Sequence, residues 1–279
     1  MKLRIQHHTH YGYSEPLQYS VQQLLLWPAD GPTQRVLSWR VDAPSTLYAL
    51  PDGMGNRCHG FTLQADALKP RLAMDISASG CVVTMDVAAF HEGGDAPHPA
   101  FFLRSSPHAE PHPRMGAWAR QAVPDLDEAL QAGVTPSDEL WLALAQAVAH
   151  KVRYRSGSTG VETTALEAFD WGLGVCQDQA HVMLAVCRSL GVSARYVSGY
   201  FYADTEPDLA SHAWVDVCTH ALDRRWLSID VTHHRLTDGR YVRLAVGSDY
   251  TACPPVKGLR RGGGDETLRV SVQIAPEPD

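Results

Sequence analysis

The chain has 279 residues, of which 44% are hydrophobic and 20% are charged, a balance that excludes a disordered or collagen-like protein. Its 24 basic and 31 acidic residues give a net charge of −7, so the overall charge provides no attraction to nucleic acid or to an anionic membrane. No run of about 18 apolar residues is present, and no apolar stretch follows the basic residues near Met1. We therefore expect no membrane-spanning helix, no signal peptide and a cytoplasmic location.

The N-terminal third is predicted to form short β-strands separated by turns. Strands are expected at residues 3–6, 21–27, 35–41, 61–63 and 81–87, which are β-prone or alternate in polarity. Pro, Gly and Asp or Asn cluster between them, as in residues 29–32 and 52–56. This pattern predicts an antiparallel sandwich or half-barrel. Residues 93–113 are rich in Pro, His and Gly and are the best candidate for a linker.

Helical periodicity begins after this segment. Thr135 is expected to cap a helix that has Pro136 at its first position and apolar residues at helical spacing behind it. Further helices are expected at residues 164–169 and 176–190. Strands are expected at residues 194–202, 213–217, 226–229, 241–245 and 268–274. The sequence thus predicts an α+β protein, with an antiparallel β-rich domain at residues 1–110 and a second domain at residues 111–279 whose helices pack on an antiparallel sheet.

The six cysteines are sparse and irregularly spaced. The chain has no CxxC pair and no export signal, so they indicate neither a disulfide framework nor a zinc site. Five of them are interpreted as small buried hydrophobic residues: Cys58, Cys81, Cys187, Cys218 and Cys253. The sixth, Cys176, has neighbours that favour a different role.

Cys176 follows two glycines in the segment GLGVCQD and falls in the first turn of a predicted helix. A thiolate at that position is stabilised by free backbone N–H groups and by the helix dipole, which lower the thiol pKa from about 8.5. A single cysteine on the apolar face of a helix is more often a core residue. The assignment of Cys176 as a nucleophile therefore depends on partners elsewhere in the chain.

Two later segments supply candidate partners. His212 begins a predicted strand in SHAWVDV, and Asp230 ends another in WLSIDVT. Neighbouring antiparallel strands can place the two side by side and facing the cysteine helix. A nucleophile, an imidazole base and a carboxylate that orients the imidazole are the groups that covalent acyl transfer requires. The pattern alone leaves open whether the three meet in space.

The segments GVCQDQAH, CRSLGVSARYVSGY, SHAWVDV and WLSIDVTH resemble the bacterial transglutaminase-like superfamily, in the order of its triad. The beginning of the chain, HHTHYGYSEPLQYSVQQLLLWP with GNRCHGFTL, resembles the bacterial transglutaminase-like N-terminal region. The resemblance implies a papain-like core in which Cys176 is the nucleophile, His212 the general base and acid, and Asp230 the orienting residue. The family usually has Asp-Pro-Thr at the third position, whereas here Val231 replaces the proline. We expect valine to keep an extended backbone and the triad to persist.

The resemblance also implies an enzyme that acts on peptide or amide bonds through a thioester. Water is the expected acceptor, which makes the chain a cysteine peptidase or amidase. An amine acceptor, as in a true transglutaminase or an amide-bond-forming enzyme, is the first alternative. A binding or scaffold protein with the same fold is the second. We expect a peptide or protein substrate and no cofactor, metal, nucleic acid or membrane partner. The backbone N–H of Cys176 is a natural oxyanion donor, and the sequence identifies no second donor.

Several other residues carry weaker signals. On a strand, His8 and His10 share one face while His7 takes the other, so an ordinary strand end is favoured over a metal site. Asp178 is expected to support the cysteine helix rather than to act in catalysis. His181 lies about 140° around that helix from Cys176 and is not the expected base.

Three aromatic residues and one basic segment complete the candidates. Trp171, Tyr154 and Trp214 are each either core residues or walls of a substrate groove, and core packing is favoured. Residues 257–264 are basic and rich in glycine, and we expect a solvated loop there. A loop that passes close to the active site is the alternative for this segment.

Overall fold

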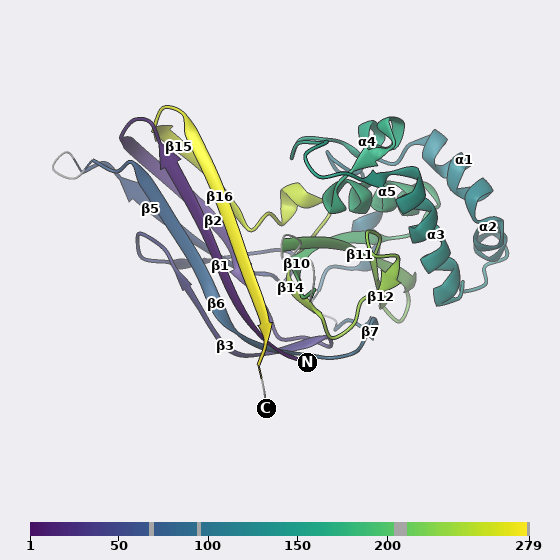
Figure 1. Ribbon diagram of the computed structural model, residues 1–279. Coiled ribbons are helices and arrows are strands. Elements are labelled where there is room, and N and C mark those ends of the chain that lie inside the picture. The colour runs from purple at the N-terminus through teal and green to yellow at the C-terminus, as the bar shows by residue number, and fades with distance from the viewer. Residues whose placement is uncertain (67–69, 94–95, 204–210, 278–279) are drawn as a thin grey trace.

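The computed structural model describes residues 1–66, 70–93, 96–203 and 211–277. A β-sandwich lies beside a unit in which helices cover one sheet, as Figure 1 shows. The α+β class and the antiparallel N-terminal domain predicted from the sequence are therefore confirmed. None of the described helices combines the length and the apolar character needed to cross a membrane.

The sandwich consists of two four-stranded antiparallel sheets. The first has the order β16-β1-β6-β3, with β16 Glu266–Pro276, β1 Lys2–Tyr13, β6 Ala73–Thr84 and β3 Gln34–Asp42. The second has the order β15-β2-β5-β4, with β15 Val256–Gly262, β2 Leu17–Trp27, β5 Arg57–Gln64 and β4 Tyr48–Leu50. Alternate residues of β1, such as Leu3 and Ile5, are buried between the sheets against Phe61 and Ile76.

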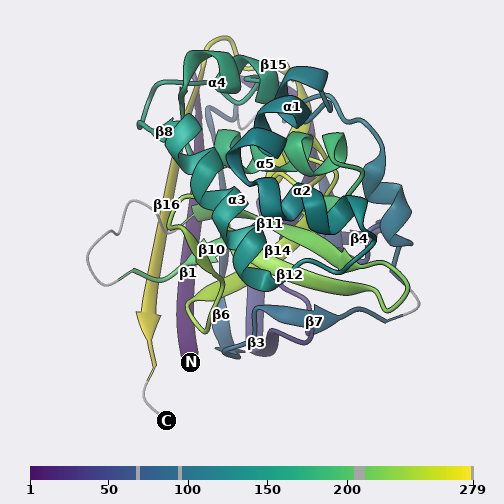
Figure 2. The ribbon, with the colours of Figure 1, turned by 90° about the vertical axis from the view of Figure 1, so that its right-hand side faces the viewer.

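The second unit contains a sheet of the order β13-β12-β11-β10-β14, and β7 also pairs with β12. Its strands are β7 Ala89–His91, β10 Ala194–Phe201, β11 Ser211–His220, β12 Arg225–Asp230, β13 Arg235–Leu236 and β14 Tyr241–Gly247. Its helices are α1 Pro113–Ala122, α2 Pro124–Gln131, α3 Asp138–Lys151, α4 Ala165–Trp171 and α5 Cys176–Ser189. Figure 2 shows these helices in front of the sheet. The central helix, α5, is buried along almost its whole length because it packs on β11 and β10 beneath the other helices.

The C-terminal strands belong to the N-terminal sheets. β16 pairs with β1 along its length, from Leu3 opposite Pro276 to Tyr13 opposite Glu266. β15 pairs with β2. The expected loop at residues 257–264 is therefore wrong for most of its length, because the segment forms β15 and only then turns. The division of the chain at residue 110 stays a prediction, and strand pairing places residues 256–276 with the first sheets.

Three further boundaries differ from the sequence predictions. α3 begins at Asp138 after Ser137, rather than at Pro136. β6 ends at Thr84 instead of extending to residue 87. The predicted linker at residues 93–113 is a packed connection in its described part. The buried Arg188 of α5 donates hydrogen bonds there to the carbonyl oxygens of Phe102 and Ala109 at 3.0 and 2.7 Å.

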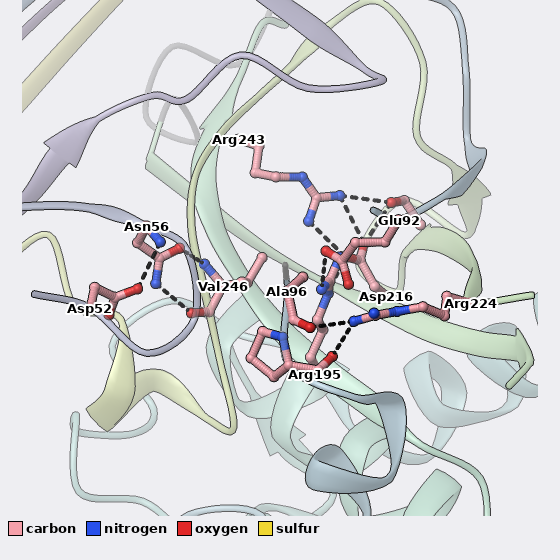
Figure 3. Close-up of polar contacts among 11 residues, drawn as sticks. Asp52, Asn56, Glu92, Ala96, Arg195, Asp216, Arg224, Arg243 and Val246 are labelled. Atoms are coloured by element: carbon pink, nitrogen blue, oxygen red, sulfur yellow. Dashed lines mark hydrogen bonds and ion pairs between the residues drawn. The ribbon is translucent and has the colours of Figure 1, made fainter. Parts of the chain in front are cut away.

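Two side-chain amides bind the sandwich to β14, an edge strand of the sheet in the second unit. Asn56 accepts from the backbone N–H of Val246 at 2.8 Å and donates to its carbonyl at 2.9 Å (Figure 3). Gln34 makes the same pair of bonds with Arg243, at 2.7 and 2.8 Å. Each amide therefore satisfies one residue's backbone groups on an otherwise unpaired strand edge and fixes the position of the sandwich relative to this sheet.

A buried ion cluster lies behind the same sheet (Figure 3). Asp216 of β11 accepts from Arg195 at 2.8 Å and from both terminal nitrogens of Arg243 at 2.6 and 2.9 Å. Arg195 also pairs with Glu92 at 2.7 Å. Burial by itself raises the pKa of Asp216. Arg243 and Arg195 lower this pKa by more than burial raises it, and the net value is about 2. The carboxylate is thus charged at neutral pH and fully compensated.

Candidate active site

The backbone around Cys176 is shaped by two glycines. Gly172 ends α4 in the left-handed region at φ 68°, where other residues are strained. At Gly174, an added Cβ would lie 2.6 Å from the Cβ of Asp178. Only glycine allows this close approach of the chain to the helix that follows. Cys176 is the first residue of that helix, α5.

Asp178 holds this entry in place. Its buried carboxylate accepts from the N–H of Val175 at 2.7 Å and from the Thr159 hydroxyl at 2.6 Å. Burial raises the pKa of Asp178, whereas the bonds from Thr159 and Val175 lower it. These contacts confirm the predicted role of Asp178 as support for the helix. They fix the N-terminal turn from which the Cys176 backbone N–H and thiol project.

The structure brings His212 and Asp230 together. The Nε2 atom of His212, at the start of β11, lies 2.8 Å from a carboxylate oxygen of Asp230, at the end of β12, and both side chains are buried. The other ring nitrogen, Nδ1, is buried and has no regular hydrogen bond among the described residues. The Cys176 side chain nevertheless interacts with this imidazole strongly enough to raise its pKa. The three predicted residues therefore form one constellation.

The electrostatics of this pair favour charged groups. Burial by itself lowers the pKa of His212, but the Asp230 carboxylate and then Cys176 raise it more, giving a net value of about 10. For Asp230 burial raises the pKa, and the charge and hydrogen bond of His212, followed by His233, lower it below its usual range. An imidazolium beside a carboxylate is thus the stable form at neutral pH.

Asp230 has two partners that sequence reasoning did not assign. The Tyr241 hydroxyl, on β14, donates to it at 2.7 Å. His233 binds it twice, through Nδ1 at 2.6 Å and through the backbone N–H at 3.2 Å. No signal in the sequence indicates that either residue contacts Asp230. Together these bonds fix the carboxylate that faces His212.

Residues 231–234 form a turn, so the expectation of an extended backbone at Val231 is wrong. The turn is tied to the cysteine helix. Thr232 donates to the side-chain oxygen of Gln179 at 2.7 Å, and Gln179 donates to the Val152 carbonyl at 2.8 Å. A link of two side chains therefore sets the distance between α5 and the end of β12. Proline at position 231 is not required for this geometry.

The ligand atoms of His212, Asp230 and His233 lie within 4.8 Å of one another, which is close enough to hold a metal ion in principle. One carboxylate oxygen, however, lies 2.8 Å from His212 and 2.6 Å from His233, at direct hydrogen-bond distances. Nitrogen and oxygen ligands that each lie about 2.1 Å from an ion are normally farther apart than this. The cluster is therefore a network of hydrogen bonds.

A cavity of about 690 Å³ adjoins the constellation. Cys176, Gln177 and His212 line it on the side of the second unit, and residues of β1 and β16 line it on the side of the sandwich. The buried Tyr196 of β10 is also part of its wall. Cys176 thus lies at the boundary between the helix N-terminus and a space large enough for several side chains of a ligand.

The other candidates from the sequence lie outside this arrangement. Trp214 is a core residue, packed against Tyr241 with ring centroids 5.4 Å apart. The core interpretation is wrong for Trp171 and Tyr154, which are 57% and 42% exposed, and neither of them lines the cavity. The buried His181 accepts from the N–H of Tyr250 at 3.2 Å, and burial lowers its pKa to about 3. The prediction that His181 is not the base is consistent with this position.

The histidines of β1 lie on the two faces as predicted: His7 is buried, and His8 and His10 lie on the opposite face. His8 and His10 contact one oxygen of the exposed Asp75 at 3.2 and 2.8 Å. His7 binds the Tyr200 hydroxyl at 2.8 Å and the Thr9 hydroxyl at 2.9 Å. These histidines therefore have protein partners, and the ordinary strand interpretation accounts for all three.

Cys176 also differs from the remaining cysteines in exposure. It is partly exposed, whereas the other five are buried. Burial raises the pKa of the Cys187 thiol to about 12 and that of Cys218 to about 11, and it raises the pKa of Cys58, Cys81 and Cys253 as well. A thiolate is therefore disfavoured at these five positions.

Limited alkylation should distinguish Cys176 from the rest. Iodoacetamide at about pH 6 is expected to modify Cys176 first, because only this thiol combines access to solvent with an adjacent imidazole. Peptide mapping by mass spectrometry after partial reaction gives the order. Equal labelling of Cys58 or Cys253 at that pH would contradict an activated thiol at position 176.

Comparison with known proteins agrees with this geometry. Residues 124–231 match the transglutaminase-like superfamily, and residues 3–78 match the bacterial transglutaminase-like N-terminal region. An uncharacterised protein of Mycobacterium tuberculosis is 30% identical over 300 residues, which cover 99% of this chain and 93% of that protein. A protein-glutamine gamma-glutamyltransferase of Pseudomonas aeruginosa is 31% identical over 152 residues, covering 49% of this chain and 22% of that enzyme.

Among solved structures, a candidate cysteine protease from Cytophaga hutchinsonii has a TM-score of 0.75 at 20% identity, covering 100% of this chain and 92% of that chain. This likeness shows the fold. A cysteine at the N-terminus of a helix that packs on an antiparallel sheet, with histidine and aspartate on that sheet, defines the class of papain-like thiol folds. The chain belongs to the transglutaminase-like superfamily and carries its bacterial N-terminal region.

Proposed function

We propose that this protein is a thiol-dependent acyl-transfer enzyme that cleaves peptide or amide bonds. The observation that supports it best is the buried 2.8 Å contact between His212 and Asp230, with Cys176 next to the same imidazole at the edge of a cavity. In this proposal Cys176 is the nucleophile, His212 the general acid and base, and Asp230 the group that orients His212. A peptide or protein is the substrate.

The proposed reaction has two steps. The Cys176 sulfur bonds to the carbonyl carbon of the substrate, the carbon–nitrogen bond breaks, and the imidazolium of His212 gives its proton to the leaving nitrogen. Water then attacks the thioester while His212 accepts a proton from it, and the carbon–sulfur bond breaks, which releases a carboxylic acid and restores the thiolate and the imidazolium. The backbone N–H of Cys176, at the start of α5, is the proposed hydrogen-bond donor to the negative charge that develops on the carbonyl oxygen.

The similarity to the Pseudomonas gamma-glutamyltransferase favours an amine acceptor as a second candidate. Water remains the first choice, because amine transfer requires a second site that positions the amine and limits water. The described residues that line the cavity include no Asp or Glu that would hold an alkylammonium group. A non-catalytic scaffold is the third candidate, and it would require no activated thiol.

The acceptor can be tested by product analysis. A panel of blocked peptides is incubated with the protein, with and without millimolar cadaverine, and the products are weighed by mass spectrometry. We expect hydrolysed peptide and little amine-linked product, because water is present at far higher concentration. Predominant incorporation of cadaverine would make the protein a transglutaminase. Absence of both products across the panel would favour the scaffold interpretation.

A further inference from the structure

The wall of the cavity opposite Cys176 is built by two paired strands of the sandwich. From β1 it receives His7, Thr9 and Tyr11, which are alternate residues and therefore lie on one face of the sheet. This is expected, because β1 lies between β16 and β6 and presents only a face to its surroundings.

β16 contributes differently. Val270, Ser271, Val272 and Gln273 are consecutive, and all four line the cavity. Side chains of consecutive strand residues point to opposite faces, so one face alone cannot account for this set. β16 is the terminal strand of its sheet. The cavity therefore borders β16 along its backbone, and the outward row of backbone N–H and C=O groups on this terminal strand has no partner strand within the described sheet.

The same strand offers apolar side chains to the cavity. Leu268 and Val270 pair with Tyr11 and Thr9, so they lie on the face that looks into it. They are 56% and 50% exposed, so their aliphatic surface is accessible to a ligand in the cavity. Exposed apolar side chains next to a free strand edge are the two features that recognise an extended peptide.

The cavity wall also has little charge. Among the residues that the structure describes, those that line it include no Asp, Glu, Lys or Arg. His7 is engaged by Tyr200 and Thr9, and burial together with the neighbouring His8 lowers its pKa to about 4, so it is neutral at pH 7. A charged side chain placed against this wall would lose solvation without gaining a partner. The wall favours uncharged residues in a ligand.

We propose that the substrate is an extended peptide segment that adds as a further strand to the free edge of β16, with apolar side chains on Leu268 and Val270 next to the bond that Cys176 attacks. This inference rests on the proposed function, because it takes Cys176 as the nucleophile. It adds the conformation of the substrate and the chemistry of its side chains to that proposal.

Affinity labels test the inference without a known substrate. Two blocked tripeptidyl chloromethyl ketones are compared, one with leucine and one with aspartate at the two residues next to the reactive group. The leucine reagent should alkylate Cys176 at least about tenfold faster, given the usual value of burying one aliphatic side chain. A leucine reagent with N-methylated backbone amides should lose most of this advantage, because it cannot donate hydrogen bonds to a strand edge.

Variants of the wall provide the matched comparison. The double variant Leu268→Ser/Val270→Ser should bring the leucine and aspartate reagents close to equal rates. Leu259→Ser, at an 81% exposed position on β15 outside the cavity, should leave the preference unchanged. All three forms should react with iodoacetamide at the same rate, which shows that the thiol and the fold are intact.

The outcomes separate the two proposals. If iodoacetamide shows no selectivity for Cys176, the proposed function is wrong. If iodoacetamide is selective but the leucine and aspartate reagents react equally, the proposed function stands. The proposal that the cavity wall selects apolar side chains is then wrong. If the double variant still reacts faster with the leucine reagent, the proposed role of Leu268 and Val270 is also wrong. Equal rates for the N-methylated and unmodified leucine reagents would overturn strand addition.

Discussion

Replacing Asp230 by asparagine should lower turnover by about ten-thousandfold while the protein remains folded. The carboxylate accepts a hydrogen bond from His212 Nε2, which stabilises the imidazolium and leaves Nδ1 as the nitrogen that gives up a proton to the leaving group and later accepts one from water. An asparagine side chain can donate to Nε2 instead, so the ring proton moves to the nitrogen that faces Cys176. The imidazole is then in the wrong tautomer to accept a proton.

The same substitution should lower the pKa of His212. Burial lowers this pKa, and the Asp230 carboxylate is the largest of the contributions that raise it. Without the carboxylate the lowering by burial prevails, so the imidazolium is lost at a lower pH than in the wild type. The pH dependence of Cys176 alkylation by iodoacetamide gives this shift independently of any substrate.

Tyr241→Phe is the matched control for Asp230→Asn. It removes one hydrogen bond to Asp230 and leaves the carboxylate charge in place. We expect a much smaller loss of turnover than with Asp230→Asn, and the Cys176→Ala variant defines the zero of the assay. Wild-type kinetics in Asp230→Asn would mean that another group orients His212.

Replacing Asp216 by alanine should lower the free energy of unfolding by about 3–5 kcal/mol. The carboxylate balances Arg195, whose side chain is 2% exposed, and it also binds Arg243. Its removal leaves buried guanidinium charge with Glu92 as the remaining carboxylate of the cluster. Equilibrium unfolding in urea, followed by tryptophan fluorescence and circular dichroism, measures the change.

The exposed pair of Arg114 and Asp170 is the control for this substitution. The two side chains meet in two hydrogen bonds of 3.0 and 2.9 Å, yet both are largely exposed to solvent. Asp170→Ala should therefore change stability far less than Asp216→Ala. Similar effects of the two substitutions would show that burial does not determine the strength of the Asp216 cluster.

The positions of the candidate site residues were predictable because each one belongs to a short segment that determines its own geometry. Gly172 and Gly174 indicate the turn before Cys176. His212 and Asp230 lie at the ends of strands. The further partners of Asp230 were not predictable in this way. Tyr241 lies on β14, which β10 and β11 separate from β12, so only the folded sheet brings its hydroxyl to Asp230.

The fold was predicted best where local preference and tertiary pairing agree, as in α5. β6 shows the opposite case. It contains Asp75, Ser77 and Ser79, which have low preference for strands, yet all three pair with β1, and Ser77 and Ser79 pair with β3 as well. The composition of β15 predicts a loop for the same reason. Its partner, β2, precedes it by more than two hundred residues, beyond the reach of any local pattern.

The pairing of β1 with β16 has a consequence for how the protein is made. The first strand of the chain cannot acquire its outer partner until the last strand has been synthesised. Contacts of such wide sequence separation form late, since the entropy of closing a long loop must be overcome first. The segment from α3 to β14, which contains Cys176, His212 and Asp230, precedes β16 in synthesis. A chain that stops short of β16 would therefore contain Cys176 without one wall of the adjoining cavity, so the synthesis of β16 also completes the cavity.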